Sequence, residues 1–280
     1  MPFRGRLRFM EGSADEIPRG HVVTTRSGIQ IKVAPDGMYR DVYFWGDYEP
    51  YHTKIYRNLI ESGDTVLDIG ANFGWFTAQF AHWTGTTGQV HAFEPVPFIF
   101  DLASETVRLN HLDSVVRLNQ LALGRASGTI TVRTYAGLPH GHATVADLDR
   151  PDAIEHTCPL TTLDEYCDAN SVGAIQFMKV DVEGFEPDVF AGGRCTLSSS
   201  NAPIVAFEVN GTCLRARSLR SVDVIEELRR AGYSNFFSFS TRTGIRRLES
   251  DLFEYGDCIA AKASHLPRLD RALKSNRLLR

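Results

Sequence analysis

Three charged residues alternate in one short segment of the chain, Lys179, Asp181 and Glu183. The apolar residues before them predict a strand over 174–180. Alternate residues of a strand point to the same face, so Lys179 and Asp181 are expected to lie together at the strand end. A carboxylate there can take a proton from a hydroxyl group, which makes Asp181 the first candidate base, with Lys179 and Glu183 beside it. The alternative is an ion pair that only braces the strand end.

Two histidines, His140 and His142, are the second choice of base. They lie in a polar, glycine-containing segment over 135–150, which is predicted to be a loop near the acceptor. Histidine titrates near neutral pH and is a common general base. The alternative is that both side chains are only exposed to solvent.

A metal site is a further hypothesis for the same region. The next predicted strand, over 204–207, is followed by Glu208 and Asn210. Together with Asp181 these side chains offer the oxygen ligands that Mg²⁺ prefers, and the ion would polarise a hydroxyl group as a Lewis acid. Glu208 could instead orient the substrate.

A glycine-containing turn after the predicted strand 65–69 contains Asp68, Gly70, Asn72 and Gly74. The dinucleotide motif G-x-G-x-x-G would place a second glycine where Asn72 stands, so NAD binding is disfavoured. Glu94 follows the next strand, at the spacing where an acid meets ribose hydroxyls in nucleotide-binding sheets. An acid beside the loop suits an amino-acid group better than a phosphate. The pattern predicts S-adenosylmethionine; the alternative is a tight turn and a solvated Glu94.

Alternating strands and helices must position these residues. The pattern predicts βαβ units, a mostly parallel sheet and helices on both faces. Two strand-like runs without a helix between them, 235–239 and 257–261, predict an antiparallel edge, and 21–33 predicts a hairpin. The other expected strands are 89–93, 115–121 and 129–134, and the expected helices are 49–60, 74–83, 97–110, 163–169, 186–197 and 222–231.

Five segments occur in an order that resembles FkbM-type S-adenosylmethionine-dependent methyltransferases. They are VLDIGANFGWFTAQFA, GQVHAFEPVPFIFDLASETVRLN, LALG…G, TTLDEYC and IQFMKVDVEGFEPDVFAGG, within 65–210. The resemblance implies the seven-stranded class I methyltransferase sheet and O-methylation of a sugar or secondary metabolite. By position it also implies a methionine site at Asp68, Gly70, Asn72 and Gly74, a ribose site at Glu94, and an adenine site near Asn119, Gln120 and Leu121.

Composition sets the remaining expectations. A net charge of −4 disfavours nucleic acid as a partner. Five cysteines without a C-x-x-C pair, and no long apolar run, predict a cytoplasmic protein without a membrane span.

We expect an extension over 1–48, a methyltransferase domain over 49–265 and a basic, solvated tail over 266–280. The alternatives are a non-catalytic S-adenosylmethionine-binding subunit, a protein or nucleic-acid methyltransferase, and an NAD-dependent oxidoreductase; oligomeric state is open.

Overall fold

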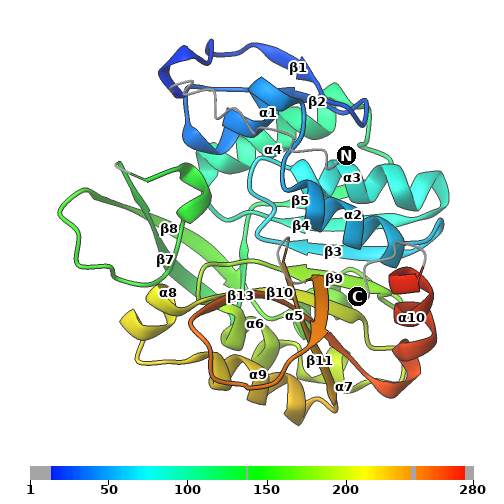
Figure 1. Ribbon diagram of the computed structural model, residues 1–280. Helices are drawn as coiled ribbons and strands as arrows, with labels where there is room; N and C mark the ends of the chain where they lie inside the picture. The colour runs from blue at the N-terminus through cyan, green and yellow to red at the C-terminus, as the bar shows by residue number, and fades with distance from the viewer. Residues whose placement is uncertain (1–13, 137, 241–243, 275–280) are drawn as a thin grey trace, which may run out of the picture.

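The structure is a computed structural model that describes residues 14–136, 138–240 and 244–274. An eight-stranded sheet runs through its centre in the order β12-β11-β13-β10-β9-β3-β4-β5 (Figure 1). Its strands are β3 (Thr65–Ile69), β4 (Gln89–Phe93), β5 (Val116–Asn119), β9 (Phe177–Val180), β10 (Ile204–Asn210), β11 (Asn235–Ser240), β12 (Gly244–Arg247) and β13 (Tyr255–Ala261). The five strands from β10 to β5 are parallel, whereas β13 lies antiparallel between β10 and β11.

The expected sheet class is therefore confirmed, with one strand more than the seven expected. The additional strand is β12, which pairs antiparallel with β11 at the edge. Its four residues, GIRR, contain a single apolar side chain, Ile245, so no strand pattern is visible in the sequence. Pairing with β11 forms this strand where local composition does not predict it.

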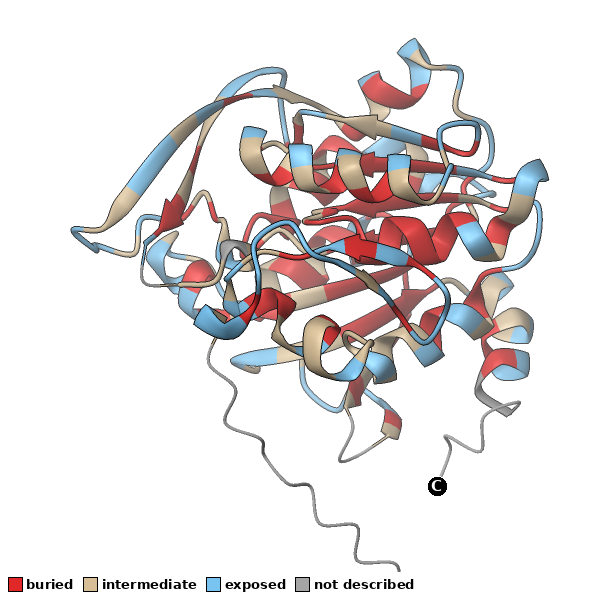
Figure 2. Ribbon diagram, turned by 90° about the horizontal axis from the view of Figure 1, so that it is seen from above, coloured by how far each residue is buried: buried red, intermediate tan, exposed pale blue. Residues whose placement is uncertain are grey.

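Helices cover both faces of the sheet, because successive residues of its buried strands point to opposite sides. Val66 packs into one core, whereas the next residue, Leu67, packs into the other. Figure 2 shows the strands buried between the layers. The first core contains residues of α2 (Pro50–Leu59), α3 (Trp75–Thr84), α4 (Pro97–Leu109) and α10 (Leu266–Lys274). The second contains residues of α5 (Leu163–Ala169), α6 (Glu186–Gly192), α7 (Arg194–Ser198), α8 (Gly211–Ala216) and α9 (Ser221–Arg230).

Several helices differ from the sequence expectations. The helix expected over 186–197 is divided into α6 and α7, and α1 (Arg40–Trp45), α8 and α10 were not expected. Of the described helices, none is long and apolar enough to cross a membrane.

A separate three-stranded sheet projects from the main body beyond α4 (Figure 1). It contains β6 (Ala122–Leu123), β7 (Gly128–Tyr135) and β8 (Ala153–Thr161). The sequence predicts most of β7 but not β8. Only Cys158 is buried in β8, so this strand lacks the apolar alternation that would reveal it. Pairing with β7 along its whole length holds it instead.

The two ends of the chain pack in different ways. The predicted hairpin is present as β1 (Val22–Thr24) and β2 (Gln30–Lys32), followed by α1 (Arg40–Trp45). The prediction of a solvated tail is wrong for α10, in which Leu269 and Ala272 are buried and Arg268 donates a hydrogen bond of 2.9 Å to the carbonyl of Leu59. Arg4, Arg6, Arg8, Arg277 and Arg280 lie outside the described residues.

Candidate active site

The loop between β3 and α3 brings the two strand ends of the predicted site together. Gly70 has a φ of +83°, and a Cβ atom on it would lie 1.8 Å from the carbonyl oxygen of Asp181. Gly74 has a φ of +84°, and its Cβ would lie 3.3 Å from atoms of Ala103 and Thr106 in α4. Glycine is required at Gly70 because it combines a left-handed conformation with close contact to another backbone segment. The space that a side chain would need at Gly70 and Gly74 is therefore occupied by the backbone of Asp181 and by α4.

A first cavity opens at the carboxyl ends of β3, β4 and β9, where open α/β sheets bind ligands. Six predicted site residues line it: Gly70, Asn72, Glu94, Leu121, Asp181 and Glu183. The other lining residues come mainly from β6, β7, α4 and the loop before β8: Ile69, Phe93, Pro95, Ile99, Ala122, Leu123, Val132, Gly141, Ala143, Thr144, Val145, Val182 and Phe185. Most of these are apolar, so polar recognition depends on a few side chains.

Glu94 is the central acid of the first cavity. It is buried, and its carboxylate accepts hydrogen bonds of 3.1 Å from the backbone N–H of Asn72 and 3.0 Å from that of Val96. Burial raises the pKa of Glu94 to about 7, against the effect of these two bonds. Each carboxylate oxygen can accept a second hydrogen bond, so Glu94 fits a ligand with two neighbouring hydroxyl groups such as a ribose.

Four residues of the predicted donor site lie outside the first cavity. Asp68 is fully buried below it and accepts a hydrogen bond of 2.6 Å from Thr77 Oγ1. Gly74 contacts α4, as described above. The amide of Asn119 donates to the carbonyl of Ala92 at 3.0 Å, and Gln120 is exposed. Among these neighbours of the predicted adenine site, only Leu121 borders the cavity.

Lys179 connects Asp68 with Asp181. Asp68 and Lys179 are paired across β3 and β9, so both side chains lie on one face. The Nζ atom of Lys179 lies 3.0 Å from Asp181 and 3.8 Å from Asp68. Burial disfavours its charge, but the two carboxylates outweigh this and raise the pKa of Lys179. Lys179 therefore stays protonated and positions Asp181; it cannot serve as a base.

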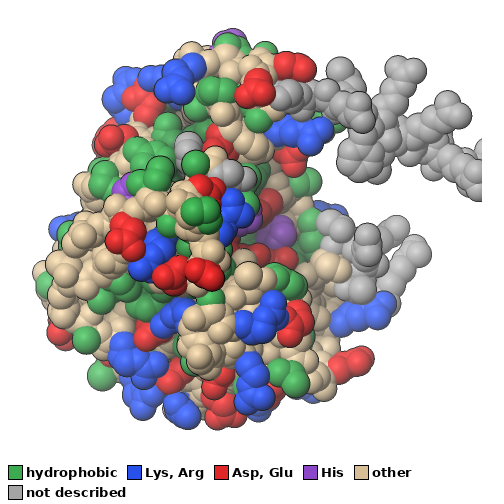
Figure 3. Space-filling model, turned by 90° about the vertical axis from the view of Figure 1, so that its left-hand side faces the viewer, with side chains coloured by type: hydrophobic (Ala, Val, Ile, Leu, Met, Phe, Trp, Pro, Cys, Tyr) green, Lys and Arg blue, Asp and Glu red, His purple; other side chains and the backbone are tan. Residues whose placement is uncertain are grey.

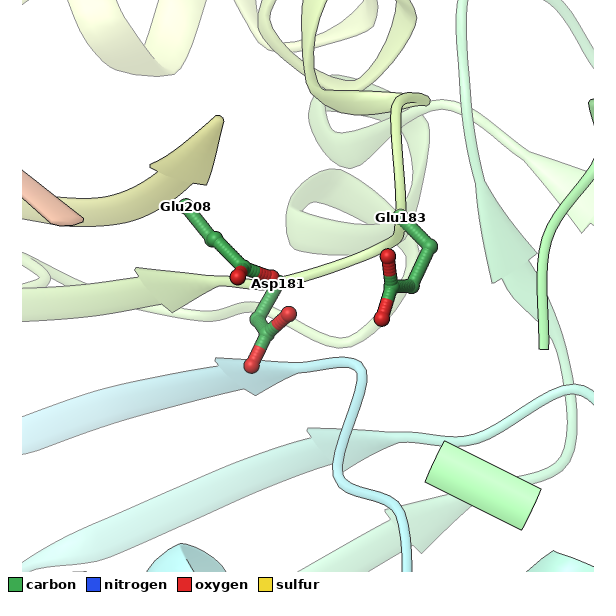
Figure 4. Close-up of side chains that lie close together, drawn as sticks. All are labelled: Asp181, Glu183 and Glu208. Atoms are coloured by element: carbon green, nitrogen blue, oxygen red, sulfur yellow. The ribbon is translucent and has the colours of Figure 1, made fainter. Parts of the chain in front are cut away.

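Three acids form a row across neighbouring strands. Asp181 follows β9, Glu208 lies in β10, and Asp257 faces Glu208 from β13. Figure 4 shows Glu208 directed toward Asp181, with Glu183 on the loop beyond β9. The charge of Asp181 and burial raise the pKa of Glu208 to about 11. Burial also acts against the charge of Asp181, but Lys179 and a hydrogen bond with Glu208 hold the pKa of Asp181 below its usual value. An ionised carboxylate thus stands beside a neutral carboxyl group.

The structure changes the predicted set of metal ligands. Carboxylate oxygens of Asp181, Glu183 and Glu208 lie within 4.8 Å of one another. The side-chain oxygen of Asn210, by contrast, accepts hydrogen bonds from the backbone N–H groups of Thr212 and Cys213 and caps α8. Its amide donates a bond of 2.6 Å to Glu183. Asn210 is therefore removed from the set and Glu183 takes its place.

Glu183 holds the loop that carries the predicted histidines. It is buried with a φ of +50°, a strained conformation of the kind found at functional sites. Its carboxylate lies 3.1 Å from His142 Nδ1, and its carbonyl accepts a bond of 2.6 Å from Thr144. The bond with Glu183 raises the pKa of His142, although partial burial opposes it. His142 does not line the first cavity, although its neighbours Gly141 and Ala143 do. The side chain of His140 is outside the described part of the structure.

A second cavity, which the sequence did not predict, adjoins the first at Asp181. It is lined by Glu49, His52, Tyr56, Lys179, Val180, Asp181, Phe207, Glu208 and Asp257. His52 Nε2 lies 3.0 Å from Asp257, and His52 Nδ1 lies 3.7 Å from Glu49. Burial lowers the pKa of His52, but these two acids outweigh it and the net shift is upward. On the face shown in Figure 3, acidic and histidine side chains gather at a hollow in the surface.

The only sequence signal for this second cavity is the spacing of Glu49 and His52, three residues apart at the start of a predicted helix. Residues at this spacing share one helix face. Nothing local connects them with Asp257, which lies about 200 residues later in the chain.

Comparisons with known proteins identify the family of this chain. The sequence profile of the family described as "Methyltransferase FkbM domain" matches residues 68–234. "Methyltransferase 1" of Beauveria bassiana (strain ARSEF 2860) is 26% identical over 145 residues, 45% of this chain and 57% of the relative. "31-O-demethyl-FK506 methyltransferase FkbM" of Streptomyces tacrolimicus is 29% identical over 185 residues, 55% of this chain and 67% of the relative.

Among solved structures, that of methyltransferase FkbM from Methylobacillus flagellatus KT is similar with a TM-score of 0.46 and 17% identity, covering 71% of this chain and 44% of that one. The chain spans little more than half the length of its Beauveria bassiana relative.

Proposed function

We propose that the chain, which belongs to the methyltransferase FkbM family, is a methyltransferase that transfers the methyl group of S-adenosylmethionine to a hydroxyl oxygen of a small molecule, a sugar or a secondary metabolite. When bound, S-adenosylmethionine supplies an electrophilic methyl group on a sulfonium sulfur. The protein must hold donor and acceptor in line and remove the hydroxyl proton. A cytoplasmic location is part of the proposal, and the five free cysteines support it.

The observation that carries the proposal is the position of Asp181 between the two cavities. In the first cavity, Glu94 is suited to the ribose, and the backbone around Gly70 and Asn72 to the methionine part. An acceptor hydroxyl in the second cavity would then meet the methyl group beside Asp181. The Asp181 carboxylate would accept the hydroxyl proton there, while the carbon–sulfur bond electrons would remain with the sulfur of the departing S-adenosylhomocysteine.

Magnesium remains a prediction for this site. Asp181, Glu183 and Glu208 would hold the ion, and the metal would polarise the acceptor hydroxyl. Dialysis against EDTA, followed by a transfer assay with and without added MgCl₂, tests this. A loss that MgCl₂ restores supports the metal, and unchanged transfer contradicts it.

Calorimetric titration tests the donor. We expect S-adenosylmethionine and S-adenosylhomocysteine to bind the wild type and NAD not to bind. Glu94→Ala should weaken both sulfur ligands by about 10- to 100-fold, because hydrogen bonds to a charged group contribute roughly 1.5–3 kcal/mol. Glu155→Ala, which removes an exposed acid on β8, is the matched control and should bind like the wild type. Binding of NAD without the sulfur ligands would favour the oxidoreductase alternative.

A non-catalytic donor-binding subunit is the second candidate for the function. It shares the donor site but does not need Asp181 as a proton acceptor. Donor binding by the wild type, with no change in the biological function of an Asp181→Asn variant, would favour that alternative.

A further inference from the structure

The walls of the second cavity extend beyond the family-matched region on both sides. Residues 68–234 contain all the candidate donor-binding residues that line the first cavity. Glu49, His52 and Tyr56 precede this region, and Asp257 follows it. The second cavity is therefore assembled where α2 and β13 meet at the end of β10.

The polar groups of this cavity are arranged on two sides. Asp181 and Glu208 stand on neighbouring strand ends, next to the first cavity. His52 and Asp257 form a second polar pair, 3.0 Å apart, with Glu49 at the other ring nitrogen. The side chains of His52 and Asp257 are 21% and 32% exposed, so a ligand in the cavity can reach them.

We infer that the second cavity is the acceptor subsite and that it takes a polyhydroxylated molecule, in which one hydroxyl reacts beside Asp181 while a neighbouring hydroxyl is held by His52 and Asp257. The inference rests on the proposed function, because the reacting hydroxyl is placed by the donor. His52 and Asp257 then select acceptors that carry a second hydroxyl group.

The chemistry of the lining argues against other classes of acceptor. An anionic group would meet the carboxylates of Glu49, Asp181 and Asp257. A cationic group would find two of these already paired with Lys179 and His52. An apolar acceptor would take polar groups out of water without replacing their hydrogen bonds, which is costly. A hydroxyl group both donates and accepts, so it can donate to a carboxylate oxygen of Asp257, which keeps free lone pairs beside its contact with His52.

The test uses radiolabelled S-adenosylmethionine and three probe acceptors at equal concentration: cyclohexanol, cis-1,2-cyclohexanediol and methyl α-D-glucopyranoside. The wild type should methylate the diol and the glucoside at least about 10-fold faster than the monohydric alcohol, since a held second hydroxyl contributes about one charged hydrogen bond. His52→Ala and Asp257→Asn should bring the ratio of the diol rate to the cyclohexanol rate close to one. Affinity for S-adenosylmethionine, measured by calorimetry, should stay within about twofold because neither residue lines the first cavity.

Two further variants control for folding. His82→Ala removes an exposed histidine on α3 and should keep the wild-type ratio. His52→Gln retains a polar side chain and should keep part of it. A wild-type preference for cyclohexanol, or an unchanged ratio in both His52→Ala and Asp257→Asn, overturns the inference. Normal donor binding without transfer to any probe also overturns it but leaves the donor site standing, whereas a wild type that binds no S-adenosylmethionine contradicts the proposed function itself.

Discussion

The two cavities that meet at Asp181 are built in opposite ways. The first is mostly apolar, and its polar groups are fixed by backbone hydrogen bonds, as those to Glu94 are. The second is lined mainly by charged side chains that pair with one another. The first cavity lies at the ends of the parallel strands β3, β4 and β9 and is closed by β6, β7, α4 and the loop before β8. The second also needs α2 and β13, from near the two ends of the chain. The proposed donor thus has a site that depends mainly on backbone groups and apolar contacts, and the proposed acceptor has one that depends on titratable side chains from distant segments.

Gly70→Ala should break both cavities and have the largest effect. The new methyl group would collide with the backbone of Asp181, and the residue would keep an unfavourable positive φ. We expect a loss of roughly 4 kcal/mol in the free energy of unfolding, measured by urea denaturation. Gly28→Ala is a matched control, because Gly28 has a φ of +84° with no atom within 4 Å of the added Cβ. It should cost only about 1 kcal/mol. Equal losses would contradict the steric role of Gly70.

Asp181→Asn should separate chemistry from donor binding. The amide retains the shape of the side chain but cannot accept a proton, so methyl transfer to the best probe acceptor should fall by about 10²- to 10⁴-fold. Affinity for S-adenosylmethionine should change much less, by less than about tenfold, because Glu94 is untouched. Glu183→Gln is the comparison variant, since this residue mainly holds the His142 loop. If Glu183→Gln abolishes transfer and Asp181→Asn does not, the assignment of the base is wrong.

Glu186 provides a pH-dependent test of the first cavity. It is fully buried and accepts hydrogen bonds from the backbone N–H groups of Val182 and Gly184, which shape the loop after β9. Burial raises the pKa of Glu186 from 4.5 to about 8. Between these values the folded protein binds more protons at this site than the unfolded chain, so the contribution to stability falls as pH rises.

Glu186→Gln removes the titrating group and with it the pH-dependent contribution of Glu186 to stability. The free energy of unfolding of the variant, relative to wild type, should rise by about 1 kcal/mol per pH unit between pH 5 and 8. Urea denaturation across this range measures the difference. A difference that stays constant with pH would show that Glu186 is ionised in the folded protein.

Asn210→Ala should have the smallest effect. The amide side chain caps α8, so its loss should cost about 1 kcal/mol of stability in thermal or urea unfolding. Asn210→Ser restores a capping oxygen and should recover most of this loss. If Asn210 were instead a metal ligand, both variants would impair any magnesium-dependent transfer equally, which would reverse our correction.

The sequence predicted the parts of the site that depend on neighbouring strands. Lys179 and Asp181 share a face as alternation requires, and Glu94 and Asn72 meet because β3 and β4 are adjacent and parallel. The structure gives other predicted site residues a backbone partner instead. Asn119 and Asn210 have residue types suited to ligand contact, yet one binds the carbonyl of Ala92 and the other caps α8.

The sequence by itself determined the alternating fold, the family and the loop after β3, because short-range periodicity and turn geometry are properties of local segments. Only the tertiary structure decided which acids lie side by side and that His52 faces Asp257. The antiparallel insertion of β13 beside β10 places Asp257 next to Glu208, and packing of α2 over the sheet brings His52 to it. These contacts join residues 49 positions apart (Glu208 and Asp257) and about 200 positions apart (His52 and Asp257), so no local sequence pattern predicts them.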